Sequence, residues 1–425
     1  MRSALSPLIP VIVWAFFLPL QTRYFLWQPE INGGVVEYAV VSLYLLPILC
    51  FVWFSVSSFF WGDLPAERDN SSRAITVWWV VATIAVTVCF LVSSLLAVDP
   101  SLSLGFLANI LTAGLFAVTL FDRRIALQPV LLAFVLGLLP SISLGIYQVV
   151  FGSSPAITFF GLAARDALRP GDAVLLVGDT RILRAYGFFP HPNIFGGYLA
   201  IALVGVAYLW SQSRRFFYGL LFATLFGGLL LTASRSAFLG LVCGLFSLIV
   251  FFYCTAKYRR LTTFFTLSVS MALFIGLFAA PGLLSSVRGG GALEQKSVSE
   301  RVAGITDLPI LSPTRFLLGA GPGNTPAALH ALHPAWEAWR LQPPHIVSLV
   351  ILIEFGVFTV GFLMVVLGYG MVFLYRRFLP EDRLYLAWLH VLIPIAFFDH
   401  YLVTLYSGMV LVSFVWVFSL RGRMM

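Results

Sequence analysis

The sequence predicts an all-α polytopic membrane protein with about twelve transmembrane helices and two long outward-facing loops. Three observations lead to this fold class. The 425 residues are 60% hydrophobic and only 10% charged, with a mean hydropathy of +0.95. The apolar residues gather in stretches of about 20, the length that crosses a bilayer. The arginines gather in alternate connections between these stretches. No soluble globular class has this balance, so residues 1–425 are expected to form a single transmembrane domain.

The apolar stretches define the expected helices in order. No small-residue cleavage site follows the first stretch, so we expect it to be a retained span and not a signal peptide. The last two stretches are short and could be one helix with a break. The expected spans are residues 7–26, 36–60, 74–97, 102–121, 126–151, 193–210, 216–232, 236–256, 261–284, 345–375, 384–399 and 401–420.

The placement of positive charge predicts the orientation of these spans. One set of short alternating connections carries 15 of the 26 Lys and Arg residues. By the positive-inside rule these connections and both ends of the chain face the cytoplasm. The long loops at 152–192 and 285–344 then face outward. Topology therefore explains the net charge of +8, and no nucleic-acid partner is expected.

The outward face is expected to bind an anion. Arg235, in GLLLTASRSAFLGL, lies at the outer end of an apolar hairpin. A guanidinium at the bilayer centre would cost at least ~2.5–3.5 kcal/mol, whereas one near the interface can reach water. The two loops add nine further basic residues, namely Arg165, Arg169, Arg181, Arg184, Arg288, Lys296, Arg301, Arg315 and Arg340. The guanidinium fork matches phosphate oxygens; solvated loop charge is the alternative interpretation.

His345 is the candidate for general-base chemistry. It follows two prolines in QPPHIVSLVILIEFG, at the expected outer mouth of a long span. An imidazole with a pKa near 6.5 can accept a proton, and nearby arginines would keep it neutral. The alternative is a histidine that only caps the interface. His191, between two prolines, is expected to shape the turn into its span, with Asn193 as the N-cap.

The second outer loop contains a glycine-rich turn and a short helix. GAGPGN, residues 319–324, could present backbone amides to an anion. Thr325 as N-cap and Pro326 at N1 predict a helix that lies on the bilayer, because Trp336 and Trp339 follow it. His330 and His333 are three residues apart, but no third metal ligand stands beside them in the sequence.

Other acidic residues point away from metal chemistry. The chain has no Asp-x-Asp motif, so neither a metal–diphosphate site nor any cofactor is expected. Glu354 lies about 180° around a helix from His345 and is assigned to internal packing or pairing. Asp399 and His400, at an outer span end, could orient a partner side chain. The cysteines lack CxxC spacing and are interpreted as core residues.

Four segments occur in a distinctive order between residues 180 and 361: RAYGFFPHPNIFGGYLA, LTASRSAFLGL, SERVAGITDLPILSPTRFLLGAGPGN and PHIVSLVILIEFG. Together they resemble the O-antigen ligase / O-antigen polymerase superfamily of bacterial envelope glycosyltransferases. His345 and Gly356 keep the eleven-residue interval of the ligase branch. Ile346 replaces a polar residue of that branch, and Gly361 comes five positions after Gly356 where the branch has three. The resemblance is therefore stronger to the superfamily than to lipopolysaccharide ligase itself.

The resemblance implies a metal-independent transfer of a glycan from a polyprenyl-diphosphate carrier to an acceptor hydroxyl. The reaction would occur at the outer face of the bacterial cytoplasmic membrane, on a fold similar to the membrane-embedded glycosyltransferases. It would make Arg184 and Arg235 the diphosphate-binding pair, with Arg301 a third cation, and His345 the base. The acceptor would be a glycolipid, a glycan or a protein.

Two other functions fit the same residues. An O-antigen polymerase or a protein O-oligosaccharyltransferase would use the same donor with another acceptor. A flippase of lipid-linked glycans would line a translocation path with the arginines. Against the flippase, the positive charges outside the cytoplasmic connections gather at the outer side, and the sequence has no evident inverted repeat.

Overall fold

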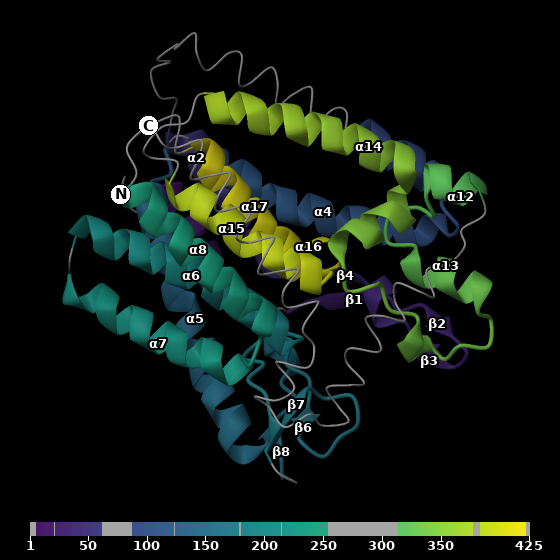
Figure 1. Cartoon of the computed structure of the whole chain (residues 1–425), viewed down its shortest axis with the longest axis horizontal. Coiled ribbons are helices and arrows are strands. Elements are labelled where there is room, and N and C mark those ends of the chain that lie inside the picture. Colours follow the sequence, from purple (N-terminus) through teal and green to yellow (C-terminus); the bar gives the residue numbers. More distant parts are fainter. Residues whose placement is uncertain are drawn as a thin grey trace.

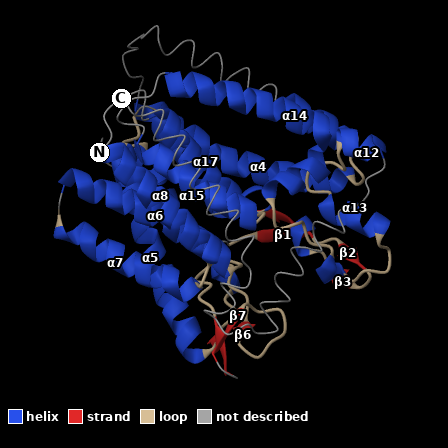
Figure 2. Ribbon diagram, in the orientation of Figure 1, coloured by secondary structure: helices blue, strands red, loops and turns tan. Residues whose placement is uncertain are grey.

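The computed structural model describes residues 6–20, 22–61, 87–122, 124–177, 180–213, 215–253, 313–376 and 383–421. This part of the chain is mostly helical, with a few short strands (Figure 2). The expected span at 261–284, most of the one at 74–97 and the candidate Arg301 lie outside the described residues.

The long helices follow the apolar stretches. Within the described ranges they are α1 (Leu8–Phe17), α2 (Leu45–Trp61), α4 (Pro100–Phe121), α5 (Leu127–Phe151), α6 (Pro192–Ser213), α7 (Phe216–Thr232), α8 (Arg235–Tyr253), α14 (Val347–Arg376), α15 (Arg383–Phe398) and α17 (Tyr406–Arg421). Three shorter helices complete them: α12 (Pro313–Leu318), α13 (Thr325–Leu332) and α16 (Tyr401–Thr404).

Three of the described helices are long and apolar enough to cross a membrane: α4, α5 and α6. They lie close to the expected spans at 102–121, 126–151 and 193–210. Seven further apolar helices are shorter, with 10–17 residues in their apolar parts. The helices support a membrane protein, whereas the full number of twelve spans stays a prediction.

The prediction of continuous helices at 7–26 and 36–60 is wrong for part of each stretch. Helix α1 ends at Phe17, and β1 (Tyr24–Trp27) pairs antiparallel with β4 (Val41–Leu43). Between them, β2 (Glu30–Ile31) and β3 (Gly34–Val35) form a hairpin, followed by the 3-10 turn η2 (Glu37–Ala39). Asn32 and Gly33 turn the hairpin with φ values of 50° and 77°. Asn-Gly is the pair that such a two-residue turn favours, and hydropathy alone does not detect it.

Helix α6 is the centre of the bundle. It packs against α7, α8 and α15, and every residue from Ile194 to Val206 is buried. Helix α15 lies along α8, where a Cβ on Gly240 or Gly244 would come within 2.7 Å of a Val391 atom. These glycines are the small residues that let two helices approach closely.

The strands and short helices gather at one end of the helical bundle (Figure 1). The first long loop contributes β5 (Ser153–Ser154), β6 (Arg165–Asp166) and the hairpin of β7 (Val174–Val177) with β8 (Thr180–Leu183). The second contributes α12, α13 and the 3-10 turn η5 (Ala338–Arg340). The candidate site lies where these loops meet the helix ends.

Candidate functional site

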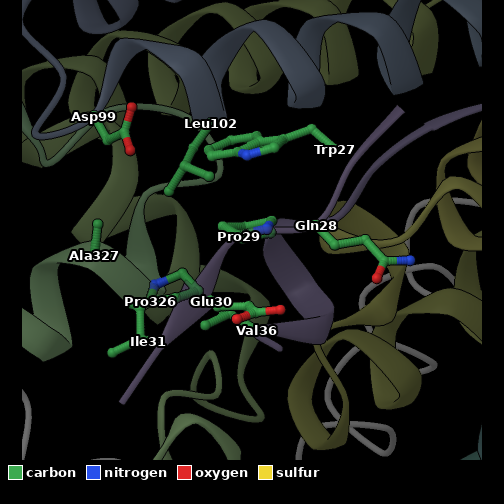
Figure 3. A pocket seen from close by; sticks show the side chains of 11 residues that line it. Trp27, Gln28, Pro29, Glu30, Ile31, Val36, Asp99, Leu102, Pro326 and Ala327 are labelled. Atoms are coloured by element: carbon green, nitrogen blue, oxygen red, sulfur yellow. The ribbon is translucent and has the colours of Figure 1, made fainter. Parts of the chain in front are cut away.

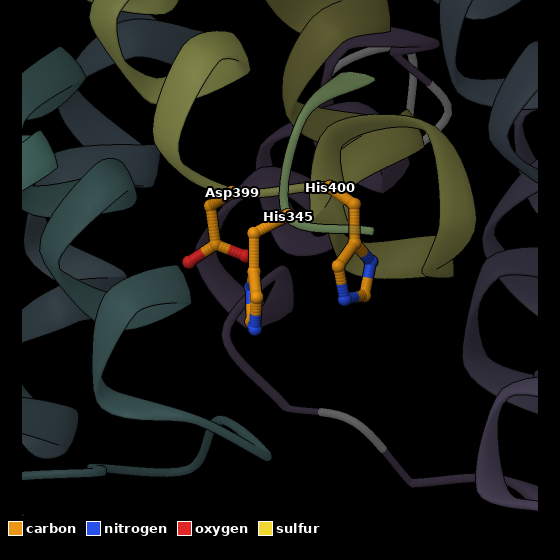
Figure 4. Close-up of side chains that lie close together, drawn as sticks. All are labelled: His345, Asp399 and His400. Atoms are coloured by element: carbon orange, nitrogen blue, oxygen red, sulfur yellow. The ribbon is translucent and has the colours of Figure 1, made fainter. Parts of the chain in front are cut away.

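His345 lies beside Asp399 and His400 (Figure 4). The three side chains come from two distant parts of the chain. His345 precedes α14, and the other two form the connection from α15 to α16. One nitrogen from each histidine and one carboxylate oxygen of Asp399 lie within 4.8 Å of one another. The two histidine rings are 5.5 Å apart between centroids, at an interplanar angle of 41°. Asp399 and His400 are buried, and His345 is half-buried.

His400 is held in its neutral form by its surroundings. Burial, with a smaller contribution from His345, lowers the pKa of His400 to about 3. One ring nitrogen, Nδ1, lies 2.7 Å from the hydroxyl of Thr404, and the ring meets Tyr38 edge-on with centroids 5.0 Å apart. His400 therefore contributes a fixed, uncharged ring beside His345.

Asn193 connects the carboxylate of Asp399 to Arg184. The side-chain amide of Asn193 donates to Asp399 Oδ2 at 2.7 Å. The side-chain oxygen of Asn193 accepts from Arg184 Nη2, also at 2.7 Å. Both hydrogen bonds involve a charged partner, which makes them stronger than neutral ones. Asn193 is thus the link between a predicted anion-binding arginine and the predicted base.

Arg184 also reaches the turn that carries Arg235. Its Nε donates to the Thr232 carbonyl at 2.7 Å, and the backbone NH of Ala185 donates to the Leu231 carbonyl. The α7–α8 turn then passes through Ala233, at φ 50°, and α8 begins at Arg235. The two arginines that were expected to share one ligand therefore stand on segments that are hydrogen-bonded to each other.

His191 lies close to Arg184 and His345. Its pKa is lowered well below the usual value by burial first, and then by Arg184, His345, Arg165 and His400. Its Nδ1 accepts the backbone NH of Asn193 at 3.1 Å, so it shapes the turn into α6 as expected. Asn193 itself is not the N-cap: α6 begins at Pro192, and the His191 carbonyl accepts the backbone NH groups of Ile194 and Phe195. The side chain of Asn193 is engaged with Arg184 and Asp399 instead.

A buried glutamine holds the loop that carries Arg184. The Gln148 side-chain oxygen accepts the backbone NH groups of Tyr186 and Gly187 at 2.8 and 2.9 Å, and its amide donates to Ser154 and to the Gly187 carbonyl. Such a fully bonded buried amide fixes the backbone around it. Sequence reasoning missed Gln148 because it lies alone within an apolar stretch.

Two other arginines of the first loop, Arg165 and Arg181, stabilise the loop itself. Arg165 forms a salt bridge with Asp172 at 2.9 Å and lies over the Tyr186 ring. Arg181 Nε donates to the Ala167 carbonyl at 2.6 Å. These contacts support a structural role for Arg165 and Arg181. Arg184, in contrast, is hydrogen-bonded to Asn193 and so lies near the histidine cluster, the group of His345, Asp399 and His400.

The GAGPGN turn does not present its amides to an external anion. The amides of Ala320 and Gly321 donate to the carbonyls of Ile353 and Glu354. The Gly323 amide donates to the Glu354 carboxylate at 2.9 Å, and the Thr325 hydroxyl donates to the same group at 2.8 Å. The acceptor at this turn is thus the carboxyl group of Glu354 itself, which confirms its assignment to internal pairing.

The chain breaks its helix to make that contact. Gly356 has φ 73° and ψ 169° inside α14, and a Cβ there would lie 2.4 Å from the Leu317 carbonyl oxygen. Glycine is required at such a position because other residues rarely adopt positive φ.

Within the described residues, one group of three side chains has the spacing to hold a metal ion: His345, Asp399 and His400. Two histidines and a carboxylate form a donor set that zinc accepts. No local motif indicates this set, because His345 lies more than 50 residues before the adjacent pair Asp399 and His400. His333 instead stacks on Trp336, with centroids 3.9 Å apart.

Comparison with known proteins gives one family. Residues 219–366 match the family model described as O-antigen ligase. This segment covers about a third of the chain and includes Arg235, Arg301 and His345, whereas Arg184, Asn193 and Asp399 lie outside it. No curated protein matches the sequence significantly. The match supports the O-antigen ligase superfamily for this chain and confirms the resemblance carried by its sequence motifs.

Proposed function

We propose that this protein transfers a glycan from a polyprenyl-diphosphate donor to an acceptor hydroxyl. The observation that carries the proposal is the hydrogen-bonded link from Arg184 through Asn193 to Asp399, beside His345. It joins an anion-binding group to a proton-accepting group in one site. The O-antigen ligase match supports this class of reaction.

The arginines act on the leaving group. As the bond between the sugar and the diphosphate breaks, negative charge accumulates on the diphosphate oxygens. Preorganised cations stabilise that charge without a proton donor, and such electrostatic stabilisation is usually the largest catalytic term. Arg184 and Arg235 are the proposed pair. Arg301 remains a proposed third cation.

His345 acts on the acceptor. It removes the proton of the attacking hydroxyl while the acceptor oxygen bonds to the anomeric carbon and the diphosphate leaves. Asp399, buried beside it, stabilises the imidazolium that forms and holds the ring in place, as carboxylates do beside catalytic histidines. The neutral His400 adds no positive charge that would hinder protonation of His345.

The bilayer would place the donor at the same level as the site. In this arrangement about twelve spans cross the bacterial cytoplasmic membrane, the loops at 152–192 and 285–344 face outward, and α13 lies near the interface. Arg235 then meets the lipid diphosphate at interface depth, where a guanidinium is tolerated.

The test uses purified full-length protein in detergent with a labelled polyprenyl-diphosphate glycan and a panel of glycolipid, glycan and peptide acceptors. Release of free polyprenyl diphosphate is followed for wild type and for His345→Ala and Arg235→Ala. His333→Ala is the matched control, because His333 lies outside the cluster. Each reaction is repeated with EDTA.

Acceptor-dependent release by wild type and the control alone supports the transferase with His345 as base. Equal release by His345→Ala removes His345 from the chemistry. Loss of release with EDTA favours a metal held by His345, Asp399 and His400. The acceptor that supports release separates a ligase from a polymerase or a protein O-oligosaccharyltransferase. Movement of labelled donor across vesicles without any acceptor would favour the flippase.

A further inference from the structure

A cavity lies between the N-terminal strands, the start of α4 and the start of α13. It has a volume of about 440 Å³, within the ~300–1,000 Å³ typical of small-molecule sites. Its lining comes from three segments: the N-terminal strands with Trp27, Gln28 and Glu30, the start of α4 with Asp99 and Leu102, and α13 with Pro326. Figure 3 shows Asp99 and Trp27 on one side of this space and Glu30 on the other.

The lining has the chemistry of a sugar site and not of an anion site. Trp27, 40% exposed, offers a flat apolar face. The carboxylates of Glu30 and Asp99 and the amide of Gln28 offer acceptors for hydroxyl groups. None of the lining residues in the described part of the chain is Lys, Arg or His. The cavity therefore disfavours phosphate or carboxylate.

The walls of the cavity are held by hydrogen bonds. Asp99 caps α4 through the backbone NH of Ser101 at 2.9 Å, and the Asp99 NH donates to Asn324 Oδ1 at 2.7 Å. The Asn32 amide ties the β2–β3 hairpin to the carbonyls of Pro334 and Trp336 at 2.9 and 2.8 Å. A cavity built in this way is preformed, which lowers the cost of binding.

One wall of the cavity belongs to the segment that contacts His400. Val36 and Ala39 line it, and Tyr38 between them meets the His400 ring. A smaller hollow shares Pro326 with the cavity and is also lined by Tyr38 and Thr404. Thr404 is hydrogen-bonded to His400. The segment that forms one wall of the cavity therefore also contacts His400, the neighbour of His345.

We propose that this cavity binds a neutral or amine-bearing sugar of the acceptor, next to the hydroxyl that reacts. The inference rests on the proposed function and adds a substrate class to it. Phosphorylated or uronic sugars are excluded at this position because two carboxylates face the ligand. Anionic diphosphate and uncharged acceptor sugar are then sorted to the two sides of the histidine cluster.

Binding is tested first without any reaction. Saturation-transfer NMR is measured on the full-length protein in a detergent without a sugar head group, with lactose, chitobiose, glucosamine and glucuronic acid as probes. Variants are Trp27→Ala, Glu30→Gln and Asp99→Asn; Asn caps a helix as well as Asp does. Trp210→Ala is the control, because Trp210 is 44% exposed at the far end of α6.

We expect wild type and the control to bind at least one of the first three sugars and not glucuronic acid. Trp27→Ala and Glu30→Gln should each weaken that binding about tenfold, the effect of ~1.4 kcal/mol, and Asp99→Asn should weaken it in the same direction. Glucuronic acid bound as well as lactose, no saturation transfer to any sugar, or binding unchanged in Trp27→Ala and Glu30→Gln would overturn the proposal.

The transfer assay separates this inference from the proposed function. In an active enzyme, Trp27→Ala should raise the KM for the acceptor about tenfold and leave the KM for the donor unchanged. An active enzyme with an unchanged acceptor KM refutes the sugar site and leaves the transferase intact. Sugar binding that depends on Trp27, in a protein that releases no polyprenyl diphosphate, supports the site and refutes the transferase.

Discussion

Replacement of Asn193 should damage both the stability and the chemistry of the site. In Asn193→Ala, Asp399 loses a 2.7 Å hydrogen bond and Arg184 loses another. Hydrogen bonds to charged groups contribute roughly 1.5–3 kcal/mol each. Asp399 is only 6% exposed, so water cannot easily replace the lost hydrogen bond, and most of its contribution is lost. The half-buried Arg184 keeps its hydrogen bond to the Thr232 carbonyl and some access to water, so less is lost there. We therefore expect the free energy of unfolding to fall by about 2–3 kcal/mol.

Two further variants test the cause of that loss. Asn193→Asp still accepts from Arg184, but it cannot donate to Asp399 and brings a second carboxylate beside it. Like charges at such a distance repel, so transfer should fall further than in Asn193→Ala and recover partly at lower pH. Asn109→Ala is the control, because its buried side-chain oxygen has no hydrogen-bond partner among the described residues. Its stability should be unchanged or higher.

The assay pairs thermal unfolding in detergent with donor turnover per folded molecule. The link predicts that turnover decreases in the order Asn109→Ala, Asn193→Ala, Asn193→Asp. If Asn193→Ala loses stability but keeps wild-type turnover, Asn193 serves only the fold. If it matches Asn109→Ala in both measurements, the link between Arg184 and Asp399 has no energetic weight.

Three further predictions follow from other parts of the structure. Arg235→Ala should abolish donor turnover in a correctly inserted protein, with partial recovery in Arg235→Lys, and full activity in Arg235→Ala would exclude a diphosphate role. The pKa of His400 in the folded protein is about 3, below its unfolded value of about 6.5, so only the unfolded state takes up a proton between these values. The free energy of unfolding should therefore fall as pH decreases from about 6.5 toward 3, by up to about 1.4 kcal/mol per pH unit. His400→Gln should reduce this slope in thermal unfolding measured from pH 7 to 5. Gly319→Ala should lower the free energy of unfolding by at least about 2 kcal/mol, because Gly319 has φ +85° and the new Cβ would lie 2.3 Å from the Glu354 carbonyl oxygen. The control is Gly219→Ala in α7, where nothing lies within 4 Å of the new Cβ; it should be neutral or stabilising by up to ~1 kcal/mol. Equal effects of the two substitutions on stability would refute the argument from close approach at Gly319.

The helices around residues 100–250 could be predicted because hydropathy is additive along the chain. Stretches of about 20 apolar residues became α4, α5 and α6 with ends displaced by a few residues. The first stretch could not be predicted in the same way. The aromatic run Tyr24–Trp27 is as apolar as a helix, but it becomes a strand because its hydrogen-bond partner, β4, lies 14 residues or more further along.

The candidate site divides in the same way. By itself, the sequence determined the class of membrane protein and showed that the two long loops are rich in arginine, and it predicted His345 and Arg235 as site residues. Only the tertiary structure decided that Asn193 joins Arg184 to Asp399, that His400 is kept neutral, and that amides of GAGPGN donate to Ile353 and Glu354. The physical reason is that hydropathy and local motifs act over one helix length, whereas hydrogen bonds such as Asn193–Asp399, 206 residues apart, exist only after the helices have packed.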